Sequence, residues 1–245
     1  MADEVDVTPA SPEDIPTIAS IWLQTMRTNP VMDFVFSNHL YGSSAPRKYV
    51  PHMYEQAFRQ GTSHFAKATY KETCEMVGYM SFRVEDGKGN DKQNSKAPYP
   101  LLKDADLELY DMYFGGRARK EKKHVSSCQR QHYTCNHRSS AHVPYNPNES
   151  PRTTSHTNAK GIGSALLRYG LSKFHLDKLP IFVVTTIRGQ GICRKFCWKD
   201  VDYVDVNLAE RAGPDLGYGM HRSPCMLDLH REVWFMRRQI MRKLK

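Results

Sequence analysis

The chain has 245 residues, of which 40% are hydrophobic and 25% are charged. These fractions are ordinary for globular domains, and they exclude collagen-like and wholly disordered chains. No stretch approaches the ~18 apolar residues that a transmembrane helix needs, and no cation of the kind that opens a secretory or mitochondrial leader precedes Arg27. The sequence therefore predicts a cytoplasmic protein without a membrane span, with the nucleus as the alternative.

The formal net charge of +9 is unevenly distributed along the chain. Residues 115–160 contain nine Lys or Arg and two acidic residues, and residues 230–245 contain six Lys or Arg and one Glu. The rest of the chain is therefore slightly acidic. This distribution favours a solvated basic loop and a basic tail over a nucleic-acid-binding groove. The six scattered cysteines form no dense framework, so we expect reduced thiols.

The first predicted elements are a strand and a helix. Alternation over residues 5–8 indicates the strand. Ser11 is a good helix cap, Pro12 suits the first helical position, and two acidic residues follow at the positive end of the helix. Apolar residues then recur at helical spacing, which predicts one buried face made of Ile15, Ile18, Trp22 and Met26.

A second helix is predicted over residues 46–60, with Pro51 in or near its first turn. Residues 64–70 and 75–84 are predicted to form a β-hairpin, in which Met80, Phe82 and Val84 share one face. Residues 101–114 are a weaker candidate for a further helix.

Residues 115–160 contain no Leu, Ile, Met, Phe or Trp, but they contain five of the eleven histidines. Such a segment buries too little apolar surface to offset the entropy of ordering it. We therefore predict a long irregular insertion over about residues 86–159. Its cysteines and histidines do not have the usual zinc-ligand spacing, so no metal site is assigned.

Regular structure is predicted to resume at Gly161. The expected elements, in chain order, are a helix from Gly161, a buried strand over 180–186, a short helix over 189–196, strands over 198–208 and 224–229, and a basic amphipathic helix over 230–245. Residues 1–229 are thus expected to form one domain.

One motif carries chemistry, and it lies where the polar segment enters the helix at Gly161. A helix start offers unpaired N–H groups, and glycine lets an anion approach the backbone. The sequence therefore predicts a phosphate or pyrophosphate site, although a purely structural Gly-x-Gly turn is an equal alternative. The Walker and Rossmann patterns are both absent. The candidate binding residues are Asn158, Lys160, Gly161, Ile162, Gly163 and Ser164.

The chain resembles the GNAT superfamily of N-acetyltransferases, especially its fungal-type, uncharacterised members. Gly161 and Gly163 match the glycines of the family's Gln/Arg-x-x-Gly-x-Gly/Ala motif, although Asn158 replaces the usual Gln or Arg. Residues 193–198 resemble the family's Tyr-Glu-Lys-Phe-Gly-Phe segment, with Cys193 at the tyrosine position. Residues 10–14 and 76–79 resemble the family's first helix entry and its hairpin strand. The resemblance covers residues 5–84 and 160–229.

The resemblance implies an α/β fold with a mixed central sheet, helices on both faces, and acetyl-CoA wedged where two central strands separate. It implies that the six candidate residues hold the pyrophosphate and that Cys193 occupies the place of the proton donor to the departing thiolate. The acceptor would be a small-molecule or peptide amine. The family's strand before the glycine loop has no clear counterpart, so either it is degenerate or residues 107–114 replace it. A weakly active CoA-binding module and a basic interaction protein remain alternatives.

Overall fold

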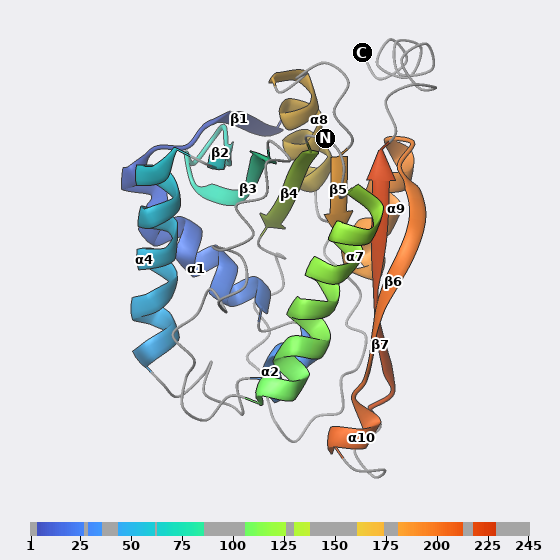
Figure 1. Ribbon diagram of the computed structural model, residues 1–245. Helices are drawn as coiled ribbons and strands as arrows, with labels where there is room; N and C mark the ends of the chain where they lie inside the picture. The colour runs from blue at the N-terminus through green and yellow to red at the C-terminus, as the bar shows by residue number, and fades with distance from the viewer. Residues whose placement is uncertain are drawn as a thin grey trace.

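The computed structural model describes residues 4–26, 29–35, 44–61, 63–85, 106–125, 130–137, 161–173, 181–212 and 218–228. Within them lies one sheet with the strand order β1-β2-β3-β4-β5-β7-β6 (Figure 1). Neighbouring strands are antiparallel except for β4 and β5, which are parallel. The strands are β1 Val5–Pro9, β2 Ser63–Tyr70, β3 Met76–Glu85, β4 Arg130–His137, β5 Ile181–Val184, β6 Lys199–Asn207 and β7 Met220–Asp228.

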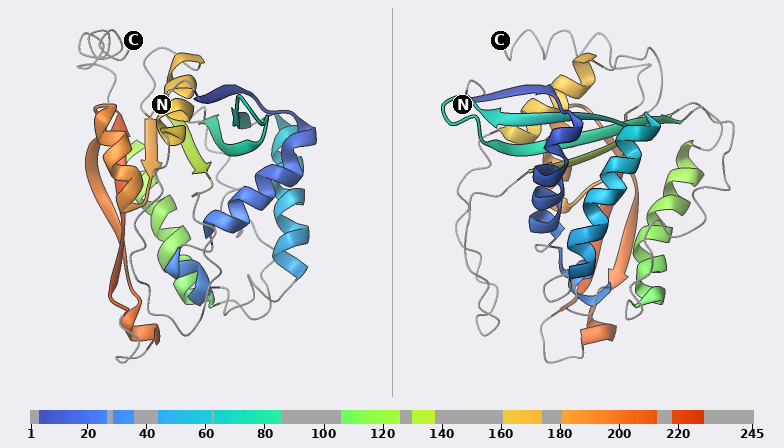
Figure 2. Two further views of the ribbon diagram at one scale, coloured as in Figure 1. Left: turned by 180° about the vertical axis from the view of Figure 1, so that it is seen from behind. Right: turned by 90° about the vertical axis from the view of Figure 1, so that its left-hand side faces the viewer.

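Helices cover both faces of this sheet, as the right-hand view of Figure 2 shows for its first strands. One face carries α1 Ile15–Met26, α2 Pro30–Val35, α4 Ser44–Gln60, α6 Leu107–Tyr110, the π-helix η3 Asp111–Gly115 and α7 Gly116–Val125. The other face carries α8 Ile162–Lys173 and α9 Ile187–Lys195. The short helix α10 Ala209–Ala212 follows β6, and the 3₁₀-helix η2 Pro12–Asp14 precedes α1.

The two faces bury two separate apolar clusters because successive side chains of a strand point to opposite sides. On β3, Tyr79 belongs to the cluster under α1 and α4, whereas the next residue, Met80, belongs to the cluster under α8. Both side chains are fully buried. The expected mixed α/β sheet with helices on both faces is confirmed.

The start of the first helix matches its predicted signals. The backbone N–H of Ser11 donates to the Asp14 carboxylate at 2.8 Å, and Lys67 of β2 donates to the same carboxylate at 2.8 Å. Ile15, Ile18 and Trp22 are buried, as predicted, whereas Met26 is only partly buried. The hairpin, the helix after Gly161, the buried strand β5 and the short helix α9 are also confirmed, within a few residues at each end.

The prediction of an irregular insertion is wrong for part of its length. Helix α7 and strand β4 both lie inside residues 86–159. The prediction considered apolar burial alone, whereas α7 is attached by charged side chains and β4 by backbone hydrogen bonding. Eight consecutive residues of β4 are paired with β3, from Gly78–His137 to Glu85–Arg130. The remainder of 86–159 lies outside the described residues, apart from 106–115.

Of the two alternatives for the strand before the glycine loop, the first agrees with the structure: strand β4 precedes the loop, and residues 107–114 are helical. Two smaller predictions are corrected. Pro51 lies in the interior of α4, because that helix begins at Ser44 rather than at residue 46. The last strand, β7, begins at Met220 rather than at residue 224, because it pairs with the whole length of β6. The predicted helix over 230–245 lies outside the described residues.

Candidate active site

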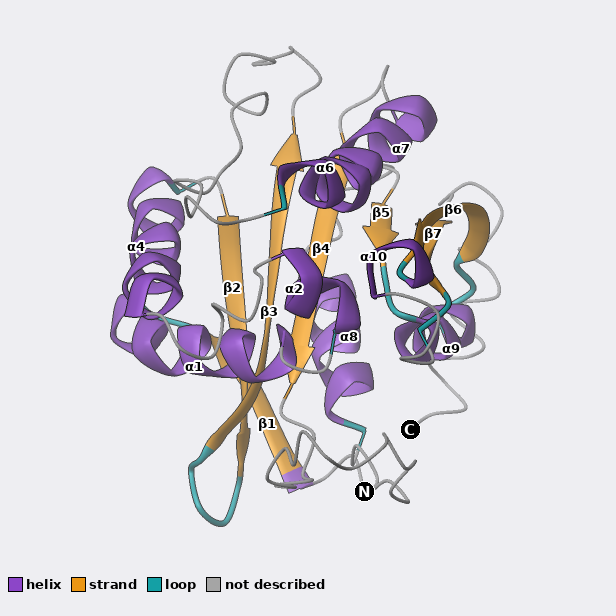
Figure 3. Ribbon diagram, turned by 90° about the horizontal axis from the view of Figure 1, so that it is seen from below, coloured by secondary structure: helices purple, strands orange, loops and turns teal. Residues whose placement is uncertain are grey.

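The candidate site lies where the two parallel strands of the sheet separate. β4 pairs with β5 through two residue pairs, Gln131–Ile181 and His132–Phe182. Beyond them, β4 continues for five residues that pair with β3, whereas β5 continues beside β7. Within the described strands, the sheet is therefore open between the carboxyl ends of β4 and β5. Figure 3, a view from below, shows both strands with α8 packed against β4.

Helix α8 begins beside this opening and presents its backbone there. The carbonyl of Gly161 accepts the first helical hydrogen bond from Ala165 N–H at 2.8 Å, so the N–H groups of Ile162, Gly163 and Ser164 precede the helical ladder. Gly161 has φ +77°, a backbone conformation that glycine adopts at little cost. A Cβ added to Gly161 would meet nothing within 4 Å. An anion can therefore approach this helix start along the main chain.

Apolar packing fixes the position of the helix start. Ile162 is buried, and Leu166, Leu167 and Leu171 continue the same buried face over β1 to β4. Four of the predicted binding residues, Gly161 to Ser164, are thus held together at the start of α8. The other two, Asn158 and Lys160, lie outside the described residues.

Cys193 lies on α9, on the same face of the sheet as α8. Its side chain is 8% exposed and belongs to the cluster that contains Ile162, Leu166 and Trp198. Burial raises the pKa of the Cys193 thiol to about 11, with a smaller contribution from Asp200. The thiol is therefore protonated at neutral pH, as a proton donor must be, but it is a weak acid.

The end of α9 contains a strained residue at a position where the family motif has glycine. Cys197 has φ +67°, in the left-handed region that costs a non-glycine residue free energy. Its backbone N–H donates to the Arg194 carbonyl at 3.0 Å, and Trp198 N–H donates to the Cys193 carbonyl at 3.2 Å. The helix thus closes in the geometry of a glycine-terminated helix, without the glycine.

A second group of polar residues lies beyond the end of β5, on the other face of the sheet, and our sequence predictions did not include it. His221 of β7 lies against Tyr113 of η3, whose hydroxyl accepts a hydrogen bond from Asn29 at 3.1 Å, and the buried Ser223 follows His221 on the same strand face. These residues come from three distant parts of the chain. The one sequence signal is the alternation of His221, Ser223 and Cys225 on a single strand face.

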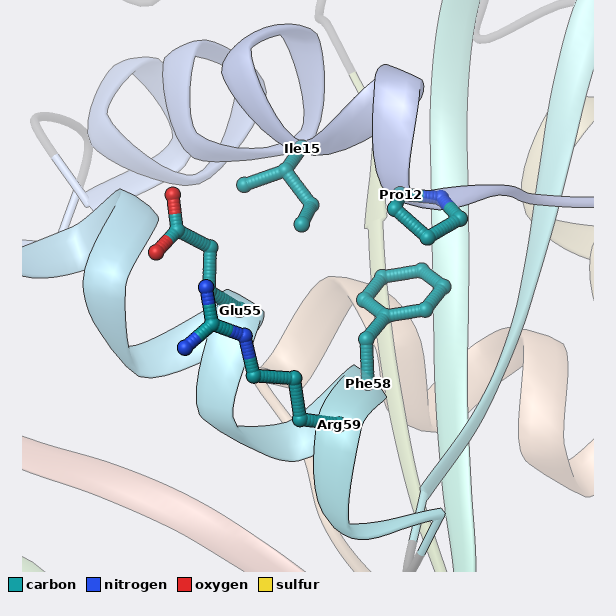
Figure 4. A pocket seen from close by; sticks show the side chains of 5 residues that line it. All are labelled: Pro12, Ile15, Glu55, Phe58 and Arg59. Atoms are coloured by element: carbon teal, nitrogen blue, oxygen red, sulfur yellow. The ribbon is translucent and has the colours of Figure 1, made fainter.

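The structure also has a pocket away from both groups. It lies between the start of α1 and helix α4, and its lining residues are Pro12, Ile15, Glu55, Phe58 and Arg59 (Figure 4). None of the predicted site residues lines it. In the part of the chain that is described, no helix is long and apolar enough to cross a membrane, and no three His, Cys, Asp or Glu residues are grouped as metal ligands.

Comparison with known proteins identifies the fold. A mosquito arylalkylamine N-acetyltransferase-like protein (5b) is 11% identical, with a TM-score of 0.58, and the match covers 92% of this chain and 99% of that one. A Corynebacterium glutamicum protein described as histone acetyltransferase HPA2 and related acetyltransferase is 16% identical, with a TM-score of 0.52 and coverage of 91% and 95%. An agmatine N-acetyltransferase mutant is 9% identical, with a TM-score of 0.53 and coverage of 93% and 100%.

Sequence comparison adds nothing to this. No protein-family model matches the chain, and no curated protein matches it significantly. The identities to the solved structures are low, so what they establish is the architecture. The chain has the mixed α/β fold of GNAT acetyltransferases.

Proposed function

We propose that the protein is an acetyl-CoA-dependent N-acetyltransferase that moves an acetyl group to an amine. The observation that carries the proposal is the opening between β4 and β5 beside the glycine start of α8. Among the described strands, the backbone of β4 is unpaired at the opening and is thus offered to an extended ligand, and the helix start offers N–H groups to the phosphates of that ligand. The family resemblance and the fold support the same activity.

Acetyl-CoA suits the chemistry of these residues. Its pyrophosphate would lie at the N–H groups of Ile162, Gly163 and Ser164, where the positive end of the α8 dipole favours an anion. Gly161, with open space at its Cβ position, would allow close approach. Asn158 and Lys160 precede this start by one to three residues, and we propose that they add polar and charged contacts to the same phosphates.

The reaction needs few groups from the protein. The acceptor enters as an ammonium and loses one proton to the solvent. The neutral nitrogen then attacks the thioester carbon, a C–N bond forms, and the C–S bond breaks. The departing sulfur takes the second nitrogen proton, directly or by way of a donor. We propose Cys193 as that donor, with a small effect, because a thiol of raised pKa transfers its proton uphill to another thiolate.

Calorimetric titration with acetyl-CoA tests the binding site, using a matched pair of variants at Ser164. In Ser164→Glu the new carboxylate repels the pyrophosphate, whereas Ser164→Gln has nearly the same shape without the charge. A glutamate in the first turn of a helix is neutral or favourable for stability, so a loss of binding would not reflect unfolding. We expect wild-type and Ser164→Gln to bind and Ser164→Glu to lose at least about tenfold in affinity. Absence of binding by the folded wild-type chain would overturn the proposal.

Steady-state kinetics of Cys193→Ala test the proton donor. We expect kcat to fall about tenfold or less, below the usual range for general acids, while the KM for acetyl-CoA is unchanged. An unchanged kcat would remove Cys193 from the mechanism and leave it a packing residue of the α8–α9 cluster. Acetyl-CoA binding without turnover of any amine would favour the alternative of a weakly active CoA-binding module.

A further inference from the structure

Two buried polar side-chain atoms on β7, from Ser223 and His221, have no hydrogen-bond partner among the described residues. Ser223 is 1% exposed, and its Oγ has no hydrogen-bond partner among the described residues. The buried Nε2 of His221, two residues earlier on the same strand face, also has none there. Buried polar atoms are nearly always hydrogen-bonded, so two neighbours of this kind point to a ligand that supplies the bonds.

A side chain beside these two residues, Tyr113, offers further contacts to a ligand. The Tyr113 and His221 rings meet edge to face, with centroids 6.1 Å apart. The Tyr113 hydroxyl accepts a hydrogen bond from Asn29 and can still donate one of its own. Tyr113 lies in a π-helix, a distortion that is frequent at functional sites. His221 as a whole is half-buried, although its Nε2 is not exposed to solvent.

The register of the sheet shows where His221 and Ser223 lie relative to the opening between β4 and β5. Val184, the last residue of β5, pairs with Cys225 of β7. Ser223 and His221 therefore lie beyond the end of β5, about 7 and 13 Å along the strand from that pair, at about 3.3 Å per residue. Arg117 connects the two places, because it donates to the Val184 carbonyl at 3.3 Å and lies 5.6 Å from the Tyr113 ring centroid.

His221 and Ser223 are themselves uncharged. Burial lowers the pKa of His221, so the imidazole is uncharged at neutral pH. In the described part of the chain, no carboxylate contacts His221 or Ser223. On the hairpin, Asp205 and Arg222 lie on the other face and pair with each other, whereas Asp202, opposite Cys225, is already bound by Lys120. A ligand with a neutral hydrogen-bonding group could form hydrogen bonds here. A cation would lose its hydration and gain no carboxylate partner among the described residues.

We infer that His221 and Ser223 bind the far end of the acceptor, which is an amine carrying a neutral hydrogen-bonding group at that end. The amine nitrogen would lie at the opening between β4 and β5, and the chain of the acceptor would pass Arg117 and Tyr113. This inference rests on the proposed acetyl transfer at the opening. It adds a substrate class: amino alcohols and similar molecules are preferred over diamines and over plain alkylamines.

A substrate series and two variants test this inference. The probes are linear amino alcohols, alkylamines and diamines of equal chain length, assayed for kcat/KM with saturating acetyl-CoA. For wild-type protein we expect the amino alcohol to exceed both others about tenfold or more. Ser223→Ala and His221→Phe should lower kcat/KM for the amino alcohol toward that of the alkylamine, which should itself be unchanged. Ser172→Ala, which removes a hydroxyl from the exposed surface of α8, is the matched control.

The outcomes separate this inference from the function on which it rests. Acetyl-CoA affinity, measured on the same samples, should be unchanged in both variants. A preference for the diamine, an amino-alcohol preference that survives both variants, or no turnover of any probe by a chain that binds acetyl-CoA would overturn the inference alone. Failure of the wild-type chain to bind acetyl-CoA would overturn the proposed function and this inference with it.

Discussion

Helices α7 and α8 lie on opposite faces of one sheet and are attached to it by different forces. Helix α8 buries Ile162, Leu166 and Leu167 against the strands. Helix α7 is strongly basic, and three of its side chains converge on one carboxylate, Asp202 of β6. The distances to Asp202 are 2.7 Å from Lys120, 3.0 Å from Lys123 and 3.1 Å from His124.

The difference shows why a basic segment need not be a loop or a binding surface. Lys120, Lys123 and His124 are spaced three and four residues apart, so they share one side of the helix. Their partner is about eighty residues away in the chain, and nothing near α7 in the sequence announces it. Two lysines that looked available for an external partner, Lys120 and Lys123, are thus used, together with His124, to attach α7 to β6.

The largest expected effect comes from the apolar attachment. Leu166→Ala, at a fully buried position of α8, should lower the free energy of unfolding by about 3 kcal/mol, because it removes buried methyl groups and leaves a cavity. Urea denaturation measures this loss. Leu107→Ala, at a leucine that is 53% exposed, is the control and should cost less than about 0.5 kcal/mol. Equal losses would mean that α8 is not held by burial.

A smaller effect is expected at Asp202. Asp202→Asn should cost about 2 kcal/mol at neutral pH, because it removes one carboxylate that three side chains share. Asp205→Asn, which loses a single exposed pair with Arg222, should cost less. Added salt should shrink the loss at Asp202 but leave the loss at Leu166 unchanged.

The pH dependence of the Asp202 effect has a definite sign. The hydrogen bond from Lys120, with those from His124 and Lys123, holds the pKa of Asp202 well below its usual range. A carboxyl group whose pKa is lower in the folded protein than in the unfolded chain stabilises the fold above the pKa of the unfolded chain, near 3.9. This stabilisation is lost as the pH falls further. Wild-type and Asp202→Asn should therefore differ fully above about pH 4, and the difference should shrink steadily as the pH falls from there toward the lowered pKa of the folded protein. A difference that persists undiminished in strong acid would contradict this account.

The smallest effect, and a gain, is expected at the end of α9. Cys197→Gly should stabilise the protein by about 0.5 kcal/mol, because relief of the left-handed backbone outweighs the added entropy of the unfolded chain. Cys197→Ala removes the same sulfur and keeps the Cβ, so it should bring no such gain. Thermal unfolding of the two variants side by side checks this, and a less stable glycine variant would show that the sulfur contributes to packing.

The elements predicted correctly are those whose signals lie within a few residues of one another in the sequence. The cap at Ser11, the alternation of the hairpin and the apolar face after Gly161 each identified an element correctly. β4 was missed because its place in the sheet comes from backbone pairing with β3, which any sequence of suitable shape can make.

The candidate site shows the same division. The helix-start half was predictable because Gly161 and Gly163 are adjacent to the apolar run that anchors them. The half that we propose for the acceptor could not be predicted, because Tyr113 and His221 come together only through the topology of the sheet. Cys193 was correctly placed on the short helix, but its burial depends on the apolar cluster that it shares with residues distant in the sequence, which spacing does not reveal.

The two residue pairs between β4 and β5 divide the sheet into two blocks, β1 to β4 and β5 to β7. A ligand seated across the division would contact both, so its binding energy would couple blocks that otherwise share little backbone pairing. Saturation at a hundred times Kd adds about 2.7 kcal/mol to the stability of the bound form. Slowed amide exchange should then appear on both sides of the division, even in strands that the ligand never touches.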